Sequence, residues 1–274
     1  MTGPADSLSV TGLSVGYPRR RVISDLTLAP MAHGSFTAVV GPNAAGKSTL
    51  LRGLAGLLPA QGSIRLGETE LTTQPRARRA ARVGFMPQAL PAGAALTLLE
   101  TVITALAVNP IDRLAMPEAQ MRRRAMEVLE RLGIGALALE PLDALSGGQR
   151  QMASLAQAIV REPAVLLLDE PTSALDLRHQ VRVMSIVREL ADAGTIVVAV
   201  LHDLGMAARW ADRLVVLDHG ALAAEGPAAD VIAPAMLARV YGVAARVEPC
   251  SAGRIQIIVD GLDSGHAPDG RTTP

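Results

Sequence analysis

The sequence has almost no lysine, a single cysteine and no long hydrophobic run, and each scarcity excludes a class of protein. One cysteine, Cys250, excludes an internal disulfide and a thiolate metal cluster within this chain, and it suits a reducing compartment. The longest apolar stretches, such as 195–201, fall far short of the roughly 18 to 20 residues that a membrane-spanning helix needs. Residues 1–10 show neither a basic leader nor the apolar centre of a secretory signal, so we expect a soluble, cytoplasmic protein.

An excess of charge of either sign is also lacking. The 26 basic residues balance 26 acidic ones, so no overall field favours nucleic acid as a partner. Arginine runs at 19–21, 76–82 and 122–124 could meet anionic lipid or another protein, but solvated faces are the simpler explanation. Only one of the basic residues, Lys47, is a lysine, which indicates that a compact ammonium group is needed at that position.

Two kinds of hydrophobic pattern predict an α/β fold. Alternating or short apolar segments predict strands of an antiparallel flank, and continuous apolar runs followed by helix-compatible sequence predict buried parallel strands. The first group comprises 8–17, 22–29 and 63–66, and the second comprises 36–40, 164–168 and 195–201. We therefore expect a mostly parallel sheet with helices on both faces and an antiparallel β flank.

Residues 91–161 lack strong strand patterns and show helical periodicity, most clearly at 118–132, so we expect them to form a helical subdomain inserted into the core. One more strand is predicted at 255–259. Residues 1–260 should then form a single domain, and the segment 261–274, rich in Gly, Ser, Pro and Asp, is predicted to be a disordered tail.

A glycine-rich phosphate loop joins the predicted strand 36–40 to a helix. It fits the pattern G-x-x-x-x-G-K-[ST] in the required strand–loop–helix context. Its residues are Gly41, Pro42, Asn43, Ala44, Ala45, Gly46, Lys47 and Ser48, followed by Thr49. Backbone N–H groups at the helix N-terminus favour anions, Lys47 would reach the β- and γ-phosphates, and Ser48 would bind Mg²⁺. The loop predicts nucleotide binding, which kinases and GTPases share.

Two further motifs are more specific. The segment 145–149 reads Leu-Ser-Gly-Gly-Gln, and the apolar strand 164–168 that follows it ends in Asp169 and Glu170. With these motifs in this order, the chain resembles the nucleotide-binding subunits of ABC transporters over roughly residues 8–245. The resemblance implies the P-loop NTPase core of the ABC ATPase fold, with ATP and Mg²⁺ as ligands.

The resemblance also implies individual roles. Tyr17 would stack on adenine, Gln88 would touch Mg²⁺ or the attacking water, and Asp169 would hold the Mg²⁺ shell together with Ser48 and Gln88. Glu170 would polarise the water that attacks the γ-phosphate, and His202 would contact that phosphate. Lys47, Gln88, Glu170 and His202 thus form the expected catalytic set. Ala44 departs from the family, which usually has glycine there; if the backbone needs a positive φ, alanine costs about 1 to 2 kcal/mol.

In the family that the chain resembles, the signature completes the site of a second subunit. Ser146, Gly147, Gly148 and Gln149 would bind the nucleotide of the partner, and Asp176 would lie in the loop that crosses the dimer interface. The implied partners are a second nucleotide-binding subunit in a homodimer or heterodimer, transmembrane permease subunits, and indirectly a periplasmic solute-binding protein. The implied location is the cytoplasmic face of the inner membrane. The apolar segment 90–104 could receive the permease or be plain core.

The segment 169–180, with Leu201-His202-Asp203-Leu204 and the segment 240–243, looks most like importers of ferric siderophores, haem and vitamin B12. We expect a ferric siderophore as cargo, with haem, cobalamin or another metal chelate as alternatives. ABC ATPases of DNA repair place a long coiled coil between phosphate loop and signature, whereas roughly 100 positions without heptads separate them here. A purely regulatory ABC domain would have a damaged catalytic set, and Glu170 and His202 are intact.

Overall fold

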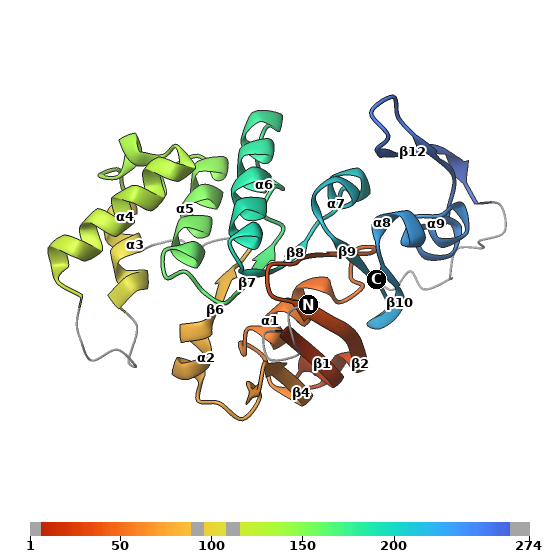
Figure 1. The fold of residues 1–274 in the computed structure, drawn as a ribbon, viewed down its shortest axis with the longest axis horizontal. Helices are drawn as coiled ribbons and strands as arrows, with labels where there is room; N and C mark the ends of the chain where they lie inside the picture. Colours follow the sequence, from red (N-terminus) through yellow and green to blue (C-terminus); the bar gives the residue numbers. More distant parts are fainter. Residues whose placement is uncertain (1–6, 89–95, 108–115, 264–274) are drawn as a thin grey trace.

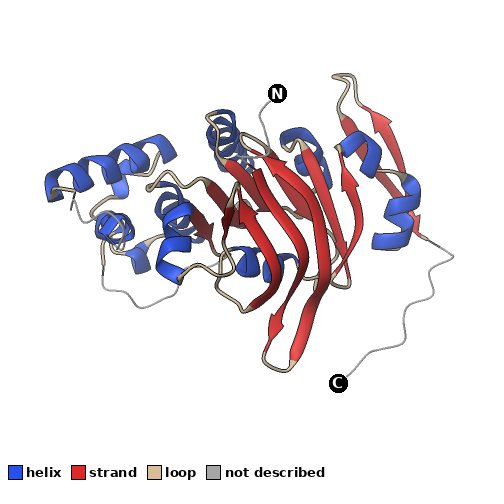
Figure 2. Ribbon diagram, turned by 60° about the horizontal axis from the view of Figure 1, so that its bottom comes forward, coloured by secondary structure: helices blue, strands red, loops and turns tan. Residues whose placement is uncertain are grey.

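A six-stranded sheet forms the centre of the protein (Figure 1, Figure 2). The computed structural model describes residues 7–88, 96–107 and 116–263. Neighbouring strands follow the order β10-β9-β3-β8-β7-β6, and all pair in parallel except β10, which is antiparallel to β9. The strands are β3 (Phe36–Val40), β6 (Val83–Met86), β7 (Val165–Asp169), β8 (Ile196–Val200), β9 (Arg213–Asp218) and β10 (Ala221–Gly226). The predicted mostly parallel sheet is confirmed.

Both faces of this sheet are buried, because alternate side chains of each strand enter different hydrophobic clusters. Phe36, Ala38 and Val40 of β3 lie in one cluster, and Val39 lies in the other. The five residues of β3 are all buried, as are those of β7 and β8. The covering helices are α1 (Lys47–Leu54), α2 (Arg76–Arg82), α6 (Leu177–Asp192), α7 (Leu204–Trp210), α8 (Ala228–Val231) and α9 (Pro234–Tyr241).

The predicted antiparallel flank is a four-stranded sheet in the order β2-β1-β4-β5. Its strands are β1 (Ser7–Tyr17), β2 (Arg20–Ala32), β4 (Ala60–Leu66) and β5 (Thr69–Glu70). A two-residue turn at 18–19 joins β1 to β2, so that Tyr17 pairs directly with Arg20. Gly16 is required beside this turn, because a Cβ atom there would lie 2.4 Å from the Arg20 carbonyl oxygen.

The helices α3 (Leu98–Ala107), α4 (Glu118–Leu132) and α5 (Gly147–Ile159) pack together at one end of the molecule (Figure 1). Two short 3₁₀ turns, Gly135–Leu137 and Leu142–Ala144, connect α4 to α5. The predicted helix 118–132 has the bounds that were expected. Of the apolar segment 90–104, residues 90–95 lie outside the described part; in the rest, Leu98, Leu99 and Val102 are buried, which favours a core role for them.

A hairpin of β11 (Val243–Pro249) and β12 (Ile255–Leu262) lies at the other end of the molecule (Figure 1). The prediction that a disordered tail begins at residue 261 was wrong at its start, because Gly261 and Leu262 pair with Ala244 and Val243 in this hairpin. The remainder, 264–274, lies outside the described residues. None of the helices in the described ranges is both long and apolar enough to cross a membrane.

Candidate active site

The phosphate loop runs from the end of β3 into α1 and holds its lysine tightly. Lys47 is 6% exposed, and its Nζ donates hydrogen bonds of 2.7 Å to the carbonyl oxygens of Gly41 and Pro42. Burial lowers the pKa of Lys47, while the charges of Glu170 and Asp169 oppose this shift. No side chain caps the start of α1 at Gly46, so the first N–H groups of the helix are available for an anion.

Ala44 adopts a left-handed backbone with φ 62°, the strain that the sequence suggested for this position. Its side chain is exposed, so Ala44→Gly removes strain without removing packing. We expect this substitution to raise the free energy of unfolding by about 0.5 to 1 kcal/mol, since the gain of about 1 to 2 kcal/mol is offset in part by glycine's greater freedom when unfolded. Thermal unfolding of the nucleotide-free protein measures the effect.

Ala45→Gly is the matched control, because Ala45 is 3% exposed and keeps a negative φ. It should lower the free energy of unfolding by about 1 kcal/mol. A lower melting temperature for Ala44→Gly than for the wild type would contradict the account of backbone strain.

Ser48 and Asp169 meet next to this lysine. The Ser48 hydroxyl donates to Asp169 Oδ1 at 2.8 Å, and the carboxylate is fully buried at the end of β7. Asp169 Oδ2 has no hydrogen-bond partner among the described residues. A hydroxyl and a carboxylate with an unpaired oxygen are donors of the kind that Mg²⁺ prefers, so these residues fit the expected ion. Burial raises the pKa of Asp169, with the Ser48 hydrogen bond opposing the shift.

Asp169→Asn should therefore stabilise the nucleotide-free protein at neutral pH. Because the pKa of Asp169 is raised on folding, its ionisation is a cost that is complete above the folded pKa and is lost as the pH falls toward the unfolded value. We expect a gain of roughly 1 kcal/mol, or about 2 to 4 °C in melting temperature, at pH 7 and a smaller gain near pH 4. Melting curves at both pH values test this.

The same substitution should abolish the additional rise in the protein's melting temperature that is expected when Mg²⁺ is added together with ATP. Asp192→Asn is the control, since Asp192 is an exposed carboxylate paired with Arg188, and it should change neither quantity by much. A pH-independent loss of stability in Asp169→Asn would contradict the assigned cost of burial.

Three residues of the predicted catalytic set contact one another. Glu170 Oε1 lies 2.6 Å from His202 Nε2, and Gln88 Nε2 donates to Glu170 Oε2 at 2.8 Å. The Glu170 side chain is 12% exposed and its backbone has φ 56°, an unusual conformation for a non-glycine residue. The strands β6, β7 and β8 deliver these groups at their carboxyl ends, where parallel strands bring polar side chains together.

Gln151 supports this glutamate and was missed by the sequence analysis. It lies in α5 and is 6% exposed; its Nε2 donates to the Glu170 carbonyl oxygen, and its Oε1 accepts from the Ala174 N–H at 3.0 Å. The helix that follows the signature is thereby joined to the loop after β7. Gln151 lies only two positions beyond the predicted signature glutamine, Gln149. This closeness to the signature is the feature of the sequence that could have indicated a role at the site.

A cavity of about 250 Å³ joins most of these groups. Its lining comprises Arg20, Val22, Asn43, Ala44, Ala45, Gly46, Lys47, Ser48, Thr49, Glu170 and His202. Arg20 and Val22 were not predicted as site residues, and Tyr17 lines a neighbouring cavity instead. Tyr17 is 44% exposed, and its hydroxyl accepts a hydrogen bond from Arg52 Nη1 at 3.2 Å.

The signature residues do not line this cavity within the described part of the chain. Ser146 instead caps α5, with a reciprocal hydrogen bond between its backbone N–H and the Gln149 side chain. A Cβ at Gly147 would meet nothing within 4 Å, so its surface is open. Asp176 caps α6 in a similar way by accepting from the His179 N–H at 2.8 Å, and hydrogen bonds from His179 lower its pKa.

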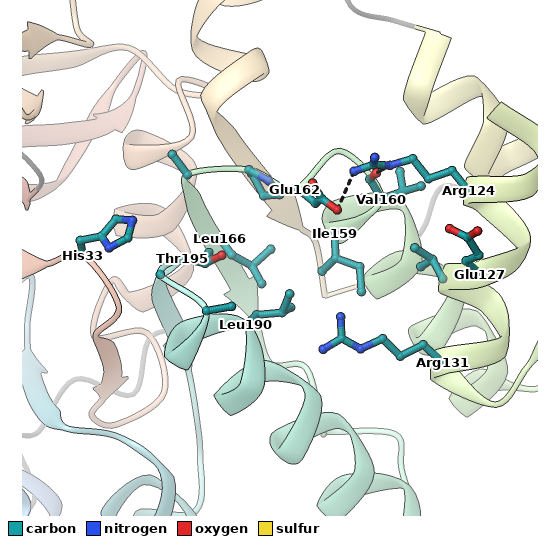
Figure 3. A pocket seen from close by; sticks show the side chains of 15 residues that line it. His33, Arg124, Glu127, Arg131, Ile159, Val160, Glu162, Leu166, Leu190 and Thr195 are labelled. Atoms are coloured by element: carbon teal, nitrogen blue, oxygen red, sulfur yellow. Dashed lines mark hydrogen bonds and ion pairs between the residues drawn. The ribbon is translucent and has the colours of Figure 1, made fainter. Parts of the chain in front are cut away.

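A larger cavity of about 580 Å³ lies at the opposite edge of the sheet, near the amino ends of β7 and β8 (Figure 3). Arg124 and Arg131 of α4 extend toward it, and each is paired with a glutamate: Arg124 with Glu162 at 2.9 Å and Arg131 with Glu189 at 2.8 Å. None of the predicted site residues lines this cavity. Its ion pairs join the helical subdomain to the core.

Comparison with known proteins places these features in a family. The model of the ABC transporter family matches residues 25–173. A hemin import ATP-binding protein HmuV of Ruegeria sp. (strain TM1040) is 37% identical over 249 residues, which cover 88% of this chain and 93% of the relative. The protein of the same name from Pseudomonas entomophila (strain L48) is 38% identical over 252 residues, covering 88% and 95%.

Solved structures agree with this. A metal-chelate type ABC transporter in an inward-facing conformation is 27% identical, with a TM-score of 0.76 over 94% of this chain and 98% of that chain. A dimeric ATP-binding cassette in a post-hydrolysis state, bound to ADP and Pi, is 26% identical, with a TM-score of 0.74 over 81% and 98%.

Proposed function

This chain belongs to the ABC transporter family and is one of its ATPases, and we propose that it powers a haem importer as the ATP-hydrolysing subunit. The observation that carries the proposal is the Gln88–Glu170–His202 cluster beside a complete phosphate loop. The catalytic carboxylate is already held by two polar side chains at the edge of the phosphate cavity. An inactive regulatory domain would not need this arrangement.

In the proposed reaction, water attacks the γ-phosphate of ATP, the bond from the γ-phosphorus to the bridging oxygen breaks, and ADP and phosphate leave. Glu170 accepts the hydrogen bond of the water and orients it, while His202 and Gln88 fix the glutamate in turn. Lys47 and the N–H groups of α1 bind the phosphates. Mg²⁺, held by Ser48, Asp169 and Gln88, would neutralise phosphate charge.

We further propose that the protein works as a dimer. The open surface at Gly147 and the exposed cap residue Ser146 are available to a second copy, and neither lines the cavity of its own chain within the described residues. The dimeric cassette bound to ADP and Pi supports this arrangement. Two nucleotides would then join two subunits, and loss of the γ-phosphate contacts would favour their separation.

Haem replaces the ferric siderophore as the proposed cargo, since several relatives are named hemin import ATP-binding proteins. A ferric siderophore, cobalamin or another metal chelate remains the alternative cargo. The similarity to a metal-chelate type ABC transporter is consistent with each of these. The cargo would pass through separate permease subunits, delivered by a periplasmic solute-binding protein. This subunit would lie at the cytoplasmic face of the inner membrane.

Reconstitution tests the proposal. The purified protein, combined in liposomes with its permease and the matching binding protein, should hydrolyse ATP faster and accumulate haem, but not a ferric siderophore or cobalamin. Uptake of a different chelate would support the proposed role as the ATPase of an importer but contradict haem as its cargo. ATP hydrolysis that no permease stimulates, in a protein that binds no permease, would exclude the importer.

A further inference from the structure

Arg20 lies directly opposite Tyr17 across the two-residue turn between β1 and β2. Side chains of a directly opposed pair project from the same face of a sheet, with Cβ atoms about 4.5 to 5.5 Å apart. A base stacked on Tyr17 would therefore have the Arg20 side chain beside it. The register of the hairpin fixes this neighbourhood, and Gly16 permits the close approach of the strands.

Arg20 also connects two cavities. It lines the 250 Å³ cavity of the phosphate loop and a neighbouring cavity of about 390 Å³ that Tyr17 lines. Among the described residues, Arg20 is the one that both linings share. A nucleotide with its base at Tyr17 and its terminal phosphates at Lys47 would have to pass this side chain.

The guanidinium of Arg20 is exposed and has no hydrogen bond or ion pair within the described ranges. Nearby arginines differ in this respect: Arg21 donates to Gln61 at 3.1 Å and Arg52 donates to Tyr17 at 3.2 Å. Arg19 is exposed as well, but it lines only the cavity of Tyr17. Arg20 thus combines an uncommitted positive charge with a place between the base site and the phosphate site.

We propose that Arg20 binds the α-phosphate of the nucleotide and so fixes the position of ATP between Tyr17 and Lys47. The inference rests on the proposed nucleotide site. A guanidinium offers planar paired donors that match phosphate oxygens, and such charge-assisted bonds are stronger than neutral ones. The arginine run 19–21, which sequence alone assigned to a solvated face, then contains one ligand residue.

Nucleotide affinity tests the inference. Affinities of ATP, ADP and AMP are measured by calorimetry, and that of adenosine by competition against a fluorescent ATP analogue. Arg20→Ala should weaken binding of the three phosphorylated ligands about five- to twentyfold, as expected for one partly exposed charged hydrogen bond, and leave adenosine within twofold. Arg20→Lys should recover part of the loss. Arg65→Ala, the matched control, removes an exposed arginine of β4 that lines neither cavity, and it should bind all four ligands as the wild type does.

Each of the following outcomes overturns the inference. Equal weakening of adenosine and ATP would place Arg20 at the base, and unchanged ATP affinity in Arg20→Ala would leave it a solvated side chain. An equal loss in Arg65→Ala would indicate only the loss of one positive charge from the protein. A wild-type protein that binds no nucleotide would reject the proposed function as well, whereas binding that is lost in Lys47→Ala but unchanged in Arg20→Ala would reject this inference alone.

Discussion

Glu170→Gln should reduce ATP turnover by about 10²- to 10⁴-fold while ATP affinity stays within threefold of the wild type. The glutamine has almost the same volume and can keep a hydrogen bond to Gln88 or His202, which now hold the two carboxylate oxygens at 2.8 and 2.6 Å. The change removes the negative charge that, in the proposed reaction, orients the attacking water. Steady-state phosphate release with Mg²⁺ and ATP measures turnover.

A dimer of this variant should also accumulate when ATP is present. In the proposed dimer, ATP binding favours the closed pair, and the hydrolysis that would reopen it is blocked. Size-exclusion chromatography with and without ATP would detect this change. The wild type should shift much less under the same conditions because it consumes its ATP.

Glu162→Gln is the matched control. Glu162 is also a glutamate with a positive φ, 48°, but it is exposed and pairs with Arg124 at the far edge of the sheet. Its turnover should remain within twofold of the wild type. Retention of more than a tenth of the wild-type rate in Glu170→Gln would show that another group activates the water.

The parts of the fold that local patterns encode were predictable. β3 was expected at its observed bounds, and a helix was expected after the phosphate loop, because an unbroken apolar run, a glycine loop and helical spacing follow one another within 20 residues. The strand β11 was missed, because its sequence mixes small, charged and apolar residues and none of its residues is fully buried. That missed partner also explains the error at Gly261.

The candidate site divides in the same way. Motif order was enough to select Gln88, Glu170 and His202, but their mutual hydrogen bonds depend on the order of β6, β7 and β8 in the sheet. Arg20 could not be separated from its neighbours in an arginine run, since only the hairpin register decides which of them faces the phosphate loop. Residue type alone carries no such information.

Lys47→Ala should weaken ATP binding by at least about 100-fold. The Nζ atom now donates to the neutral carbonyl oxygens of Gly41 and Pro42, and phosphate oxygens offer stronger charge-assisted bonds. Loss of two such bonds corresponds to roughly 3 to 4 kcal/mol, or a factor of 10² to 10³ in affinity. Calorimetric titration with ATP measures the loss, and thermal unfolding verifies that the variant is folded.

Lys47→Arg separates charge from shape, which matters in a chain whose other basic residues are all arginine. The lysine side chain is 6% exposed between the loop carbonyls, so the larger guanidinium would have to displace them at a cost of about 1 to 3 kcal/mol. We expect this variant to lose most of the affinity that Lys47→Ala loses. Near-normal ATP binding by Lys47→Arg would mean that the site needs only a positive charge, and that the single lysine has no special role.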